Sequence, residues 1–523
     1  MRQELSEFIQ LLEKSMESGV VTDRRTFLSE KRRICESLGL SVIPKNGEIL
    51  AELGGPLVSK FSSALKSKPV RTLSGVTVVA MMTKPFDCPH GTCLFCPGGT
   101  RFNTPQSYTG FEPAARRARF NDYDPYAQTI SRLKHYTFLG YSPEKIEIIV
   151  IGGTFTTLPK QYRDDFVTGI YKAMNDFSSG LEKSGPTTLD AEKRKNETAK
   201  FRCVTFAIET KPERCEEDDI KQLLDYGVTR VEMGVQSVFD DVLRKNNRGH
   251  TIKDVMDSTK RLRDHAFKVD HHVMLNMPFS DIDKDRETIR MVYEDDGLKP
   301  DAIKIYPTLV IKGTGLYSMW KAGEHQLYPA EDMVELIAEA EATAPRWLRI
   351  MRVERDIPSD RIEGGIKSTN LRQIVAERLA QLGKSPNDIR GREVGHVKLT
   401  RDPEIRFNRE NYRAAGGDEI FLSVDDIAND AIIGFLRLRV PDSSGEGLVR
   451  ELHIYGEQKN ISERGDAGFQ HKGLGSELLK RAEIITKQEY SVGNIKIISG
   501  VGVRDYYRKY GYRLENNYMV KKL

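Results

Sequence analysis

The sequence lacks any apolar run long enough to cross a membrane. Its longest apolar runs, such as IEIIVIGG, fall far short of the roughly 20 residues that a membrane-spanning helix needs. The N-terminal stretch MRQELSEFIQLLEKSM also lacks the continuous apolar segment of a signal peptide, and it carries the acidic residues that transit peptides avoid. We therefore expect a cytoplasmic protein that has no membrane segment.

The chain as a whole also lacks a large excess of charge of one sign. Lysine and arginine number 80, aspartate and glutamate 76, and the net charge is only +4. Positive charge gathers instead between residues 24 and 71, where ten basic residues accompany four glutamates. Such a segment favours binding of a polyanion, although the solvated face of a helix has the same composition. The basic residues expected to contact a polyanion here are Arg24, Arg25, Lys31, Arg32 and Arg33.

Cysteine is scarce, yet three of the six cysteines fall within the stretch CPHGTCLFCPGG. The other three, Cys35, Cys203 and Cys215, form no second pair, so the four-ligand pattern of a structural zinc site is missing. Three thiolates in one loop suit three irons of a 4Fe-4S cluster and leave the fourth iron open to a small molecule. His90 could be a further zinc ligand, so a zinc-binding loop is one alternative. A loop that binds no metal is another. The three candidate ligands are Cys88, Cys93 and Cys96.

The chain is too long for one hydrophobic core, since domains usually hold about 100 to 200 residues. Between about residues 75 and 310, short apolar strands alternate with helical stretches. This alternation predicts an α/β fold, a partial (βα)6-type barrel with its active site at the C-terminal ends of the strands. The polar insert Ser178–Lys200 lacks periodicity and is predicted to be a mobile loop. The expected strands are GVTVVAMMT, IEIIVIGG, VTFAIET, RVEMGVQS, VDHHVMLNMP and AIKIYPT.

A different pattern begins near His396 and predicts a second α/β domain with more antiparallel strands. Its expected strands are HVKL, EIFLSV, AIIGFLRLRV, LVRELHIYG, IKIISG and YMVKKL. A glycine-rich turn and the helix SELLKRAEIITKQ follow the fourth of these strands. We therefore expect a basic N-terminal segment (1–75), a barrel (76–345), a basic connecting region (346–395) and a C-terminal domain (396–523).

With these features the chain resembles the radical S-adenosylmethionine (radical SAM) enzymes. In that family the methionine end of the cofactor chelates the open iron, and its reductive cleavage yields a 5'-deoxyadenosyl radical. The spacing C-x4-C-x2-C departs from the common C-x3-C-x2-C and resembles the form in the catalytic subunit of Elongator, a radical tRNA uridine modification enzyme. The resemblance covers roughly residues 60 to 523. Further motifs that carry it are KPVRTLSGV, QSYTGFEP, YDPY, IGGTFTTLP, GVQS, RELHIYG, FQHKGLG and ISGVGVRDYYRKYGYR.

The resemblance implies a set of cofactor contacts in the barrel. Gly152, Gly153 and Thr154 end the second strand, where the family places the methionine end of S-adenosylmethionine. Glu209 ends the third strand and is expected to bind the cofactor's ribose hydroxyls or amine. Read without the resemblance, the glycines suit an ordinary turn and Glu209 suits a solvent-facing position. Gln236 and Ser237, at the end of the fourth strand, are weaker candidates.

A second set of contacts is implied for acetyl-CoA. The stretch QHKGLG before a helix resembles the phosphate-binding loop of GNAT acetyltransferases, and LVRELHIYG resembles their splayed strand. Tyr507 resembles the tyrosine that contacts the thiol in that family, and Lys145 is expected to reach acetyl-CoA from the barrel. Without the resemblance, the tyrosine suits a core position and the lysine a surface position. With Glu451, these are the expected catalytic residues. The acetyl-CoA contacts implied in the C-terminal domain are Glu451, Leu452, His453, Ile454, Gln470, Gly473, Leu474, Gly475, Ser476, Tyr506 and Tyr507.

A radical generator and an acetyl donor in one chain indicate one combined reaction. The radical would abstract hydrogen from the acetyl methyl group, the carbon radical would add to carbon 5 of a uracil, and thioester hydrolysis would leave a carboxymethyl group. An anticodon loop offers the unpaired base that such a buried site needs. An electron donor and Elongator-type accessory subunits are the other expected partners. Further phosphate contacts are expected from Arg116, Arg117 and Arg119.

Two other functions fit parts of the sequence. A protein lysine acetyltransferase with a structural cluster would acetylate lysine peptides without S-adenosylmethionine or reductant. A non-catalytic RNA-binding scaffold would leave acetyl-CoA unchanged even when tRNA is present.

Overall fold

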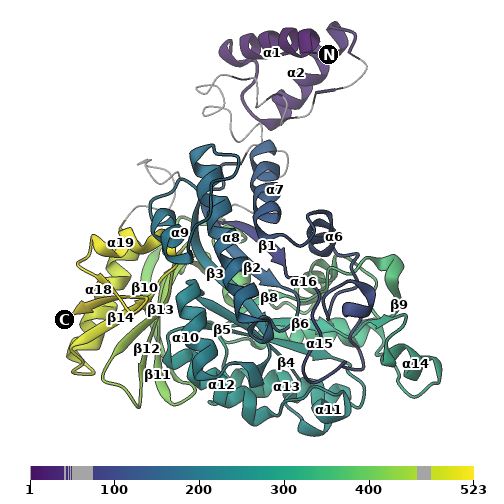
Figure 1. Ribbon diagram of the computed structural model, residues 1–523, viewed down its shortest axis with the longest axis vertical. Helices are drawn as coiled ribbons and strands as arrows, with labels where there is room; N and C mark the ends of the chain where they lie inside the picture. Colours follow the sequence, from purple (N-terminus) through teal and green to yellow (C-terminus); the bar gives the residue numbers. More distant parts are fainter. Residues whose placement is uncertain are drawn as a thin grey trace.

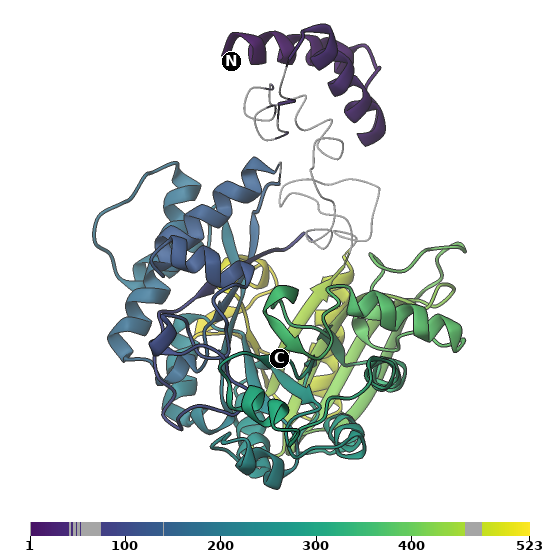
Figure 2. The same cartoon turned by 90° about the vertical axis from the view of Figure 1, so that its right-hand side faces the viewer.

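The computed structural model describes residues 2–40, 75–139, 141–455 and 473–523, together with the single residues 43, 44, 46, 49 and 53. Its first part is a pair of helices, α1 (Arg2–Glu17) and α2 (Arg24–Ser37), which Figures 1 and 2 show apart from the two sheets. The helices pack through Phe8, Leu12 and Phe27, all fully buried. Asp23 caps α2 by accepting a hydrogen bond from the Thr26 amide at 2.8 Å, which fixes where this helix begins.

The first sheet is a curled row of seven strands in the order β1-β2-β3-β4-β5-β6-β8, every neighbouring pair parallel. This confirms the partial barrel predicted from the alternating pattern. The seventh strand, β8, lies within the segment expected to connect the domains, because a strand of four residues with two arginines has no apolar run to reveal it. The strands are β1 (Thr77–Met82), β2 (Lys145–Ile151), β3 (Arg202–Thr210), β4 (Arg230–Gln236), β5 (Lys268–Leu275), β6 (Ala302–Pro307) and β8 (Arg349–Arg352).

Helices between the strands cover the outside of this sheet, as the crossover geometry of parallel strands requires. The prediction of a mobile loop over Ser178–Lys200 is wrong, because this insert contains the helix α9. Its buried Asn196 donates to the side-chain oxygen of Asn175 at 2.9 Å, so polar contacts rather than an apolar stripe hold α9 in place. The helices of this part are α6 (Pro113–Phe120), α7 (Pro125–Phe138), α8 (Lys160–Ser179), α9 (Leu189–Asn196), α10 (Glu217–Tyr226), α11 (Asp240–Lys245), α12 (Ile252–Asp264), α13 (Ile282–Glu294), α14 (Gly315–Lys321) and α15 (Ala330–Thr343).

The second sheet has the order β10-β11-β12-β13-β14-β16-β15 and is antiparallel except where β13 and β14 run parallel. The predicted strand HVKL is wrong, and the first strand is β10, whose exposed edge position needs no apolar alternation. Figure 1 shows this sheet, in green to yellow, beside the first. Its strands are β10 (Ile405–Arg413), β11 (Gly417–Asp426), β12 (Ala431–Pro441), β13 (Gly447–Ile454), β14 (Asn494–Ile498), β15 (Arg513–Glu515) and β16 (Tyr518–Lys522). The remaining elements are β7 (Val310–Ile311), β9 (Ile362–Gly364), α16 (Leu371–Gln381), α17 (Ile389–Arg392), α18 (Leu474–Gln488) and α19 (Arg504–Arg508).

A buried ionic network joins the two sheets. Arg450 on β13 contacts Asp301, which precedes β6, at 2.6 Å and Glu419 on β11 at 2.6 Å. Arg263 at the end of α12 reaches Glu419 at 2.7 Å. All four side chains are buried, and buried charges persist only when each has such partners. The two sheets are therefore held in one arrangement. No helix in the described part of the chain has the length and apolar character of a membrane span.

Candidate functional site

One cavity of about 1430 Å³ connects the inner face of the first sheet with the second sheet. The cysteine loop opens into it from the C-terminal ends of the barrel strands, and β13 and the start of α18 open into it from the other domain. Most of the residues expected to bind a cofactor therefore face one shared space. Those that line it are Cys88, Cys93, Cys96, Lys145, Gly153, Thr154, Glu209, Glu451, Leu452, His453, Ile454, Gly473, Leu474, Gly475, Ser476, Tyr506 and Tyr507.

The three cysteines of the loop lie among hydrogen-bond donors. Arg248 donates to the Cys93 sulfur at 3.3 Å, and the Ser107 amide donates to the Cys96 sulfur at 3.1 Å. Burial nevertheless raises the pKa of Cys96 to about 11 and raises the pKa of Cys88. Coordination to iron offsets such a cost because it stabilises the thiolate directly. The thiols of Cys88 and Cys96 are thus ones whose ionisation a bound metal would favour.

The spacing of the sulfurs suits a cluster better than a single zinc ion. Ligands of one tetrahedral zinc ion with bonds of about 2.3 Å lie roughly 3.8 Å from one another. Within the described chain, only Glu209, Glu232 and His272 bring three such ligand atoms within 4.8 Å of one another. The cysteine sulfurs do not, although His90 Nε2 approaches the Cys93 sulfur at 3.2 Å. Thiolates that bind different irons of a 4Fe-4S cluster need no such close grouping.

The turn after β2 lies beside the cysteine loop. Gly152 and Gly153 have φ angles of 128° and 100°, values that side-chain-bearing residues rarely adopt. A side chain at Gly152 would collide with Thr83, whereas the nearest atom to a side chain at Gly153 is 3.8 Å away. Thr154 Oγ1 is 3.9 Å from the Cys88 sulfur. The turn therefore exposes backbone next to the loop, the position expected for the methionine end of the cofactor.

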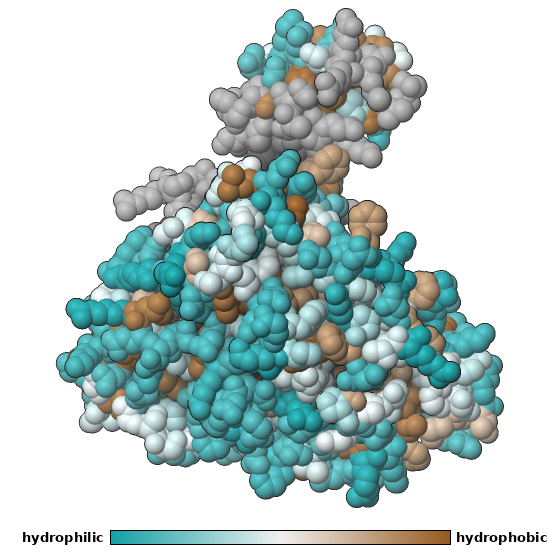
Figure 3. Space-filling model, in the orientation of Figure 1, coloured by the Kyte–Doolittle hydropathy of each residue, from teal (hydrophilic) through white to brown (hydrophobic). Residues whose placement is uncertain are grey.

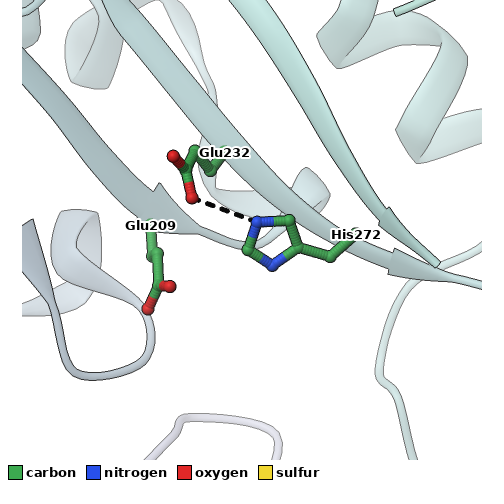
Figure 4. Close-up of side chains that lie close together, drawn as sticks. All are labelled: Glu209, Glu232 and His272. Atoms are coloured by element: carbon green, nitrogen blue, oxygen red, sulfur yellow. Dashed lines mark hydrogen bonds and ion pairs between the residues drawn. The ribbon is translucent and has the colours of Figure 1, made fainter. Parts of the chain in front are cut away.

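Inside the barrel, Glu209, Glu232 and His272 lie together on β3, β4 and β5 (Figure 4). His272 Nε2 is 3.1 Å from Glu232, and Lys304 and Arg230 also pair with this carboxylate. These cations outweigh burial and hold the pKa of Glu232 well below its usual range. Glu232 is thus neutralised by protein cations, which argues against a metal ion at this trio.

Glu209 has a different environment from Glu232. It is half-buried, lines the cavity, and accepts hydrogen bonds from the Tyr108 hydroxyl at 2.8 and 3.2 Å. Its neighbours Glu232, His272 and Lys304 were not among the residues predicted from the sequence. A signal was present, since each is an ionisable side chain within a buried strand of the parallel sheet, where apolar residues are the rule.

The expected splay in the second sheet is present. β13 pairs with β14 only from Gly447 to Val449, although β13 continues to Ile454. The hydroxyl of Ser499, just after β14, is buried in this opening without a hydrogen-bond partner in the described chain. Gly473, with φ 81°, caps α18, whose first amides face the cavity. The opening therefore lies beside the cavity at the place where the resemblance implies the extended arm of acetyl-CoA.

Comparison with known proteins places these features in a family. Residues 85–292 match the radical SAM superfamily and residues 300–381 the radical SAM C-terminal domain. The tRNA uridine(34) acetyltransferase of Methanocaldococcus jannaschii is 42% identical over 92% of this chain and 90% of its own length. Human Elongator complex protein 3 is 41% identical over 94% of this chain and 92% of its own. The chain belongs to the Elongator complex protein 3 family.

A solved structure agrees with this assignment to the Elongator complex protein 3 family. The Methanocaldococcus infernus protein without residues 1–46 is 38% identical, with a TM-score of 0.75 over 86% of this chain and all of that one. The radical SAM domain implies a 4Fe-4S cluster and S-adenosylmethionine. Cys88, Cys93 and Cys96 fit the cluster, because they are the cysteines that share the cavity.

Of the catalytic residues expected from the Elongator resemblance, Glu451 has the most defined setting. It pairs with Lys268 on β5 at 3.0 Å and with Arg437 on β12 at 3.0 Å. Burial opposes its ionisation, but the two cations outweigh burial and lower the pKa to about 2. Lys145 begins β2 at the cavity wall, and burial lowers its pKa. Burial raises the pKa of Tyr507.

The basic residues expected to contact tRNA divide into three groups. Arg24, Arg25, Arg32 and Arg33 on α2 are exposed. Lys31 on the same helix is buried, and its ammonium donates to Asn46 at 2.7 Å, so it does not share their surface. On α6, Arg116 and Arg119 are exposed and Arg117 lines the cavity. Gln470, and the basic residues beyond position 53 of the N-terminal segment, lie outside the described residues.

Proposed function

We propose that this chain carboxymethylates carbon 5 of the wobble uridine of tRNA, with acetyl-CoA as the carbon donor. The observation that carries the proposal is the shared cavity, which is lined by the cysteine loop at one end and by the splayed strand β13 at the other. An acetyltransferase alone needs no radical, and a radical enzyme alone needs no acetyl donor. Relatives named tRNA uridine(34) acetyltransferase support the choice of substrate.

A 4Fe-4S cluster held by Cys88, Cys93 and Cys96 would, with S-adenosylmethionine, supply a 5'-deoxyadenosyl radical able to take one hydrogen atom from the acetyl methyl group. The resulting carbon radical adds to carbon 5 of uracil. The adduct radical would then give the carbon 5 proton to water and one electron to a one-electron acceptor, such as the cluster that was oxidised in the first cleavage, which restores the ring. Water would then cleave the thioester to give the carboxymethyl group and coenzyme A. An electron donor is required for the first cleavage.

The chain's own residues bind and orient these reactants. Gly153 and Thr154 present backbone and a hydroxyl beside the cysteine loop, where the methionine end of the cofactor would lie. The α18 N-terminus offers backbone amides to the coenzyme A phosphates, and the opening between β13 and β14 offers the Ser499 hydroxyl to the pantetheine or thioester. Lys145, which also lines the cavity, would contact acetyl-CoA from the barrel side.

The reaction is tested with the full chain, reconstituted anaerobically and supplied with tRNA, S-adenosylmethionine, reductant and acetyl-CoA deuterated in the methyl group. Deuterium should appear in 5'-deoxyadenosine, and nucleoside analysis should find 5-carboxymethyluridine. Unlabelled 5'-deoxyadenosine together with product would mean that the radical begins elsewhere, for example on the uridine. Rapid acetylation of lysine peptides without reductant, and no modified nucleoside, would favour the acetyltransferase alternative.

A further inference from the structure

Helix α6 separates the cavity from the outer surface. On one side Ala114 and Arg117 line the cavity, while Ala115 and Ala118 pack on Met82 of β1. At the C-terminal end of the helix the ring of Phe120 is 87% exposed, more than any other large hydrophobic side chain in the described chain. Burying a phenylalanine ring stabilises a folded protein by about 1.5 to 3 kcal/mol. The exposed ring of Phe120 does not contribute this stabilisation. The fold thus gives no reason for a phenylalanine here.

A second, smaller hollow of about 370 Å³ lies at the C-terminal end of α6. Two hydrogen bonds hold the neighbouring short helix Thr100–Phe102 against this end: Tyr123 donates to the Asn103 carbonyl at 3.0 Å, and Arg119 donates to the Thr104 hydroxyl at 3.1 Å. Phe102 stands between two of the lining residues in the chain and is 60% exposed. The lining residues are Lys84, Pro85, Thr100, Asn103, Arg119, Asp122 and Tyr123.

The hollow has cations in its lining, and the exposed rings of Phe102 and Phe120 belong to residues next to its lining residues in the chain. Lys84 and Arg119 supply two positive charges against the one negative charge of Asp122, and the two most exposed large hydrophobic residues of the described chain stand in the adjoining segments. Figure 3 shows a face of the molecule that is mainly hydrophilic, with small separate hydrophobic patches. Cations that bind phosphate beside rings that stack on bases are the usual means of holding single-stranded nucleic acid.

We propose that this hollow binds an unpaired nucleotide of the tRNA that flanks the target uridine, with its base stacked on Phe120 and its phosphate between Lys84 and Arg119. The inference rests on the proposed function, because it takes the target uridine to enter the cavity on the other side of α6. Paired bases are stacked on their neighbours and cannot offer a face to Phe120, so the site selects single-stranded RNA. Phe102 provides a second apolar surface beside it.

The test compares Phe120→Ala, Phe120→Leu and Phe120→Trp in the full reconstituted chain. Loss of one stacked base should raise the Kd for an anticodon stem-loop roughly 5- to 150-fold in the Ala variant. Leu should give little rescue and Trp should restore binding, since only an aromatic ring stacks. A 2-aminopurine placed next to the wobble uridine should be quenched by the wild type and not by Phe120→Ala. The control is Ile484→Ala, which removes a hydrophobic side chain on α18 that is 42% exposed. It should change neither the Kd for the stem-loop nor the quenching of 2-aminopurine.

The outcomes separate the two proposals. Wild-type affinity and quenching in Phe120→Ala would overturn the stacking site, as would an equal loss of affinity for a duplex without a loop. Both results leave the proposed function standing if the wild type still makes 5-carboxymethyluridine. If the wild type makes no modified nucleoside while stem-loop binding depends on Phe120, the proposed function fails and the single-strand site stands.

Discussion

Cys88, Cys93 and Cys96 differ from the other cysteines in their surroundings. The three loop sulfurs face the shared cavity, whereas Cys35, Cys203 and Cys215 are buried away from it. Burial raises the pKa of Cys203 to about 12, as expected for a thiol that serves as a small apolar side chain. The same residue type therefore occurs in two different surroundings in this chain, beside the cavity and within the core.

The first prediction follows from this difference. Cys88→Ala, Cys93→Ala and Cys96→Ala should each lose iron and form no 5'-deoxyadenosine, because each removes one of three cluster ligands. Cys203→Ala and Cys215→Ala should keep their iron and still form 5'-deoxyadenosine, while the free energy of unfolding falls by about 1 kcal/mol. Iron content, visible absorption and 5'-deoxyadenosine are the measurements. A fully active Cys96→Ala enzyme would contradict the cluster assignment.

At the scale of elements, α2 shows how one helix divides its charges. Its buried face carries Phe27, Ile34 and the stem of Lys31, while its outer face presents arginines. The Arg33 guanidinium donates two hydrogen bonds to the Glu30 carboxylate, at 2.8 and 2.6 Å. Arg25 and Arg32 belong to the outer face, so they are the better candidates for phosphate contacts.

We expect Arg25→Glu and Arg32→Glu to weaken tRNA binding and to flatten its dependence on salt, since each removes a cation that neutralises a phosphate. The salt slope should fall by about one for each phosphate that is no longer neutralised. Lys31→Glu should instead lower the melting temperature, because it places a carboxylate beside the Asn46 side-chain oxygen. Binding isotherms at several salt concentrations, with acetyl-CoA affinity as the control, measure the effect. An unchanged salt slope would show that these arginines form a solvated helix face and do not contact tRNA phosphates.

Over the whole molecule, ion pairs connect the two sheets, and Glu451 contributes one of them through Lys268. Its pKa of about 2 in the folded protein lies below the ordinary value of 4.5. The ionised carboxylate therefore stabilises the folded state above pH 4.5, and this stabilisation is lost as the pH falls from 4.5 towards 2. A shift of this size corresponds to about 3 kcal/mol.

Glu451→Gln should accordingly lower the free energy of unfolding by about 3 kcal/mol at pH 7, and the difference from the wild type should shrink by about pH 3. Urea unfolding at both pH values measures it. The matched control is Glu446→Gln, whose 2.6 Å ion pair with Lys496 is about one-third exposed and should contribute under about 1 kcal/mol. A difference that stays constant between the two pH values would show that packing, not charge, accounts for the loss.

The sequence by itself determined the barrel strands, the cysteine loop and the glycine turn at Gly152 and Gly153. Each is a local feature, in which an apolar run, a ligand spacing or a positive φ depends on neighbouring residues along the chain. The same reasoning failed for HVKL, for β8 and for α9. In those places an edge position, a short length or buried polar contacts replaced the apolar pattern that local reasoning depends on.

Only the tertiary structure decided which residues meet. Glu209, Glu232 and His272 come from three strands, and Lys268 and Glu451 come from two sheets, so their spacing along the chain carries no information about contact. The structure also separated Lys31 from the arginines beside it and placed the Phe120 ring in solvent near a basic hollow. The physical reason is that burial and charge pairing depend on what packs against a residue, and the partner that pairs with Glu451 lies 183 positions away in the chain.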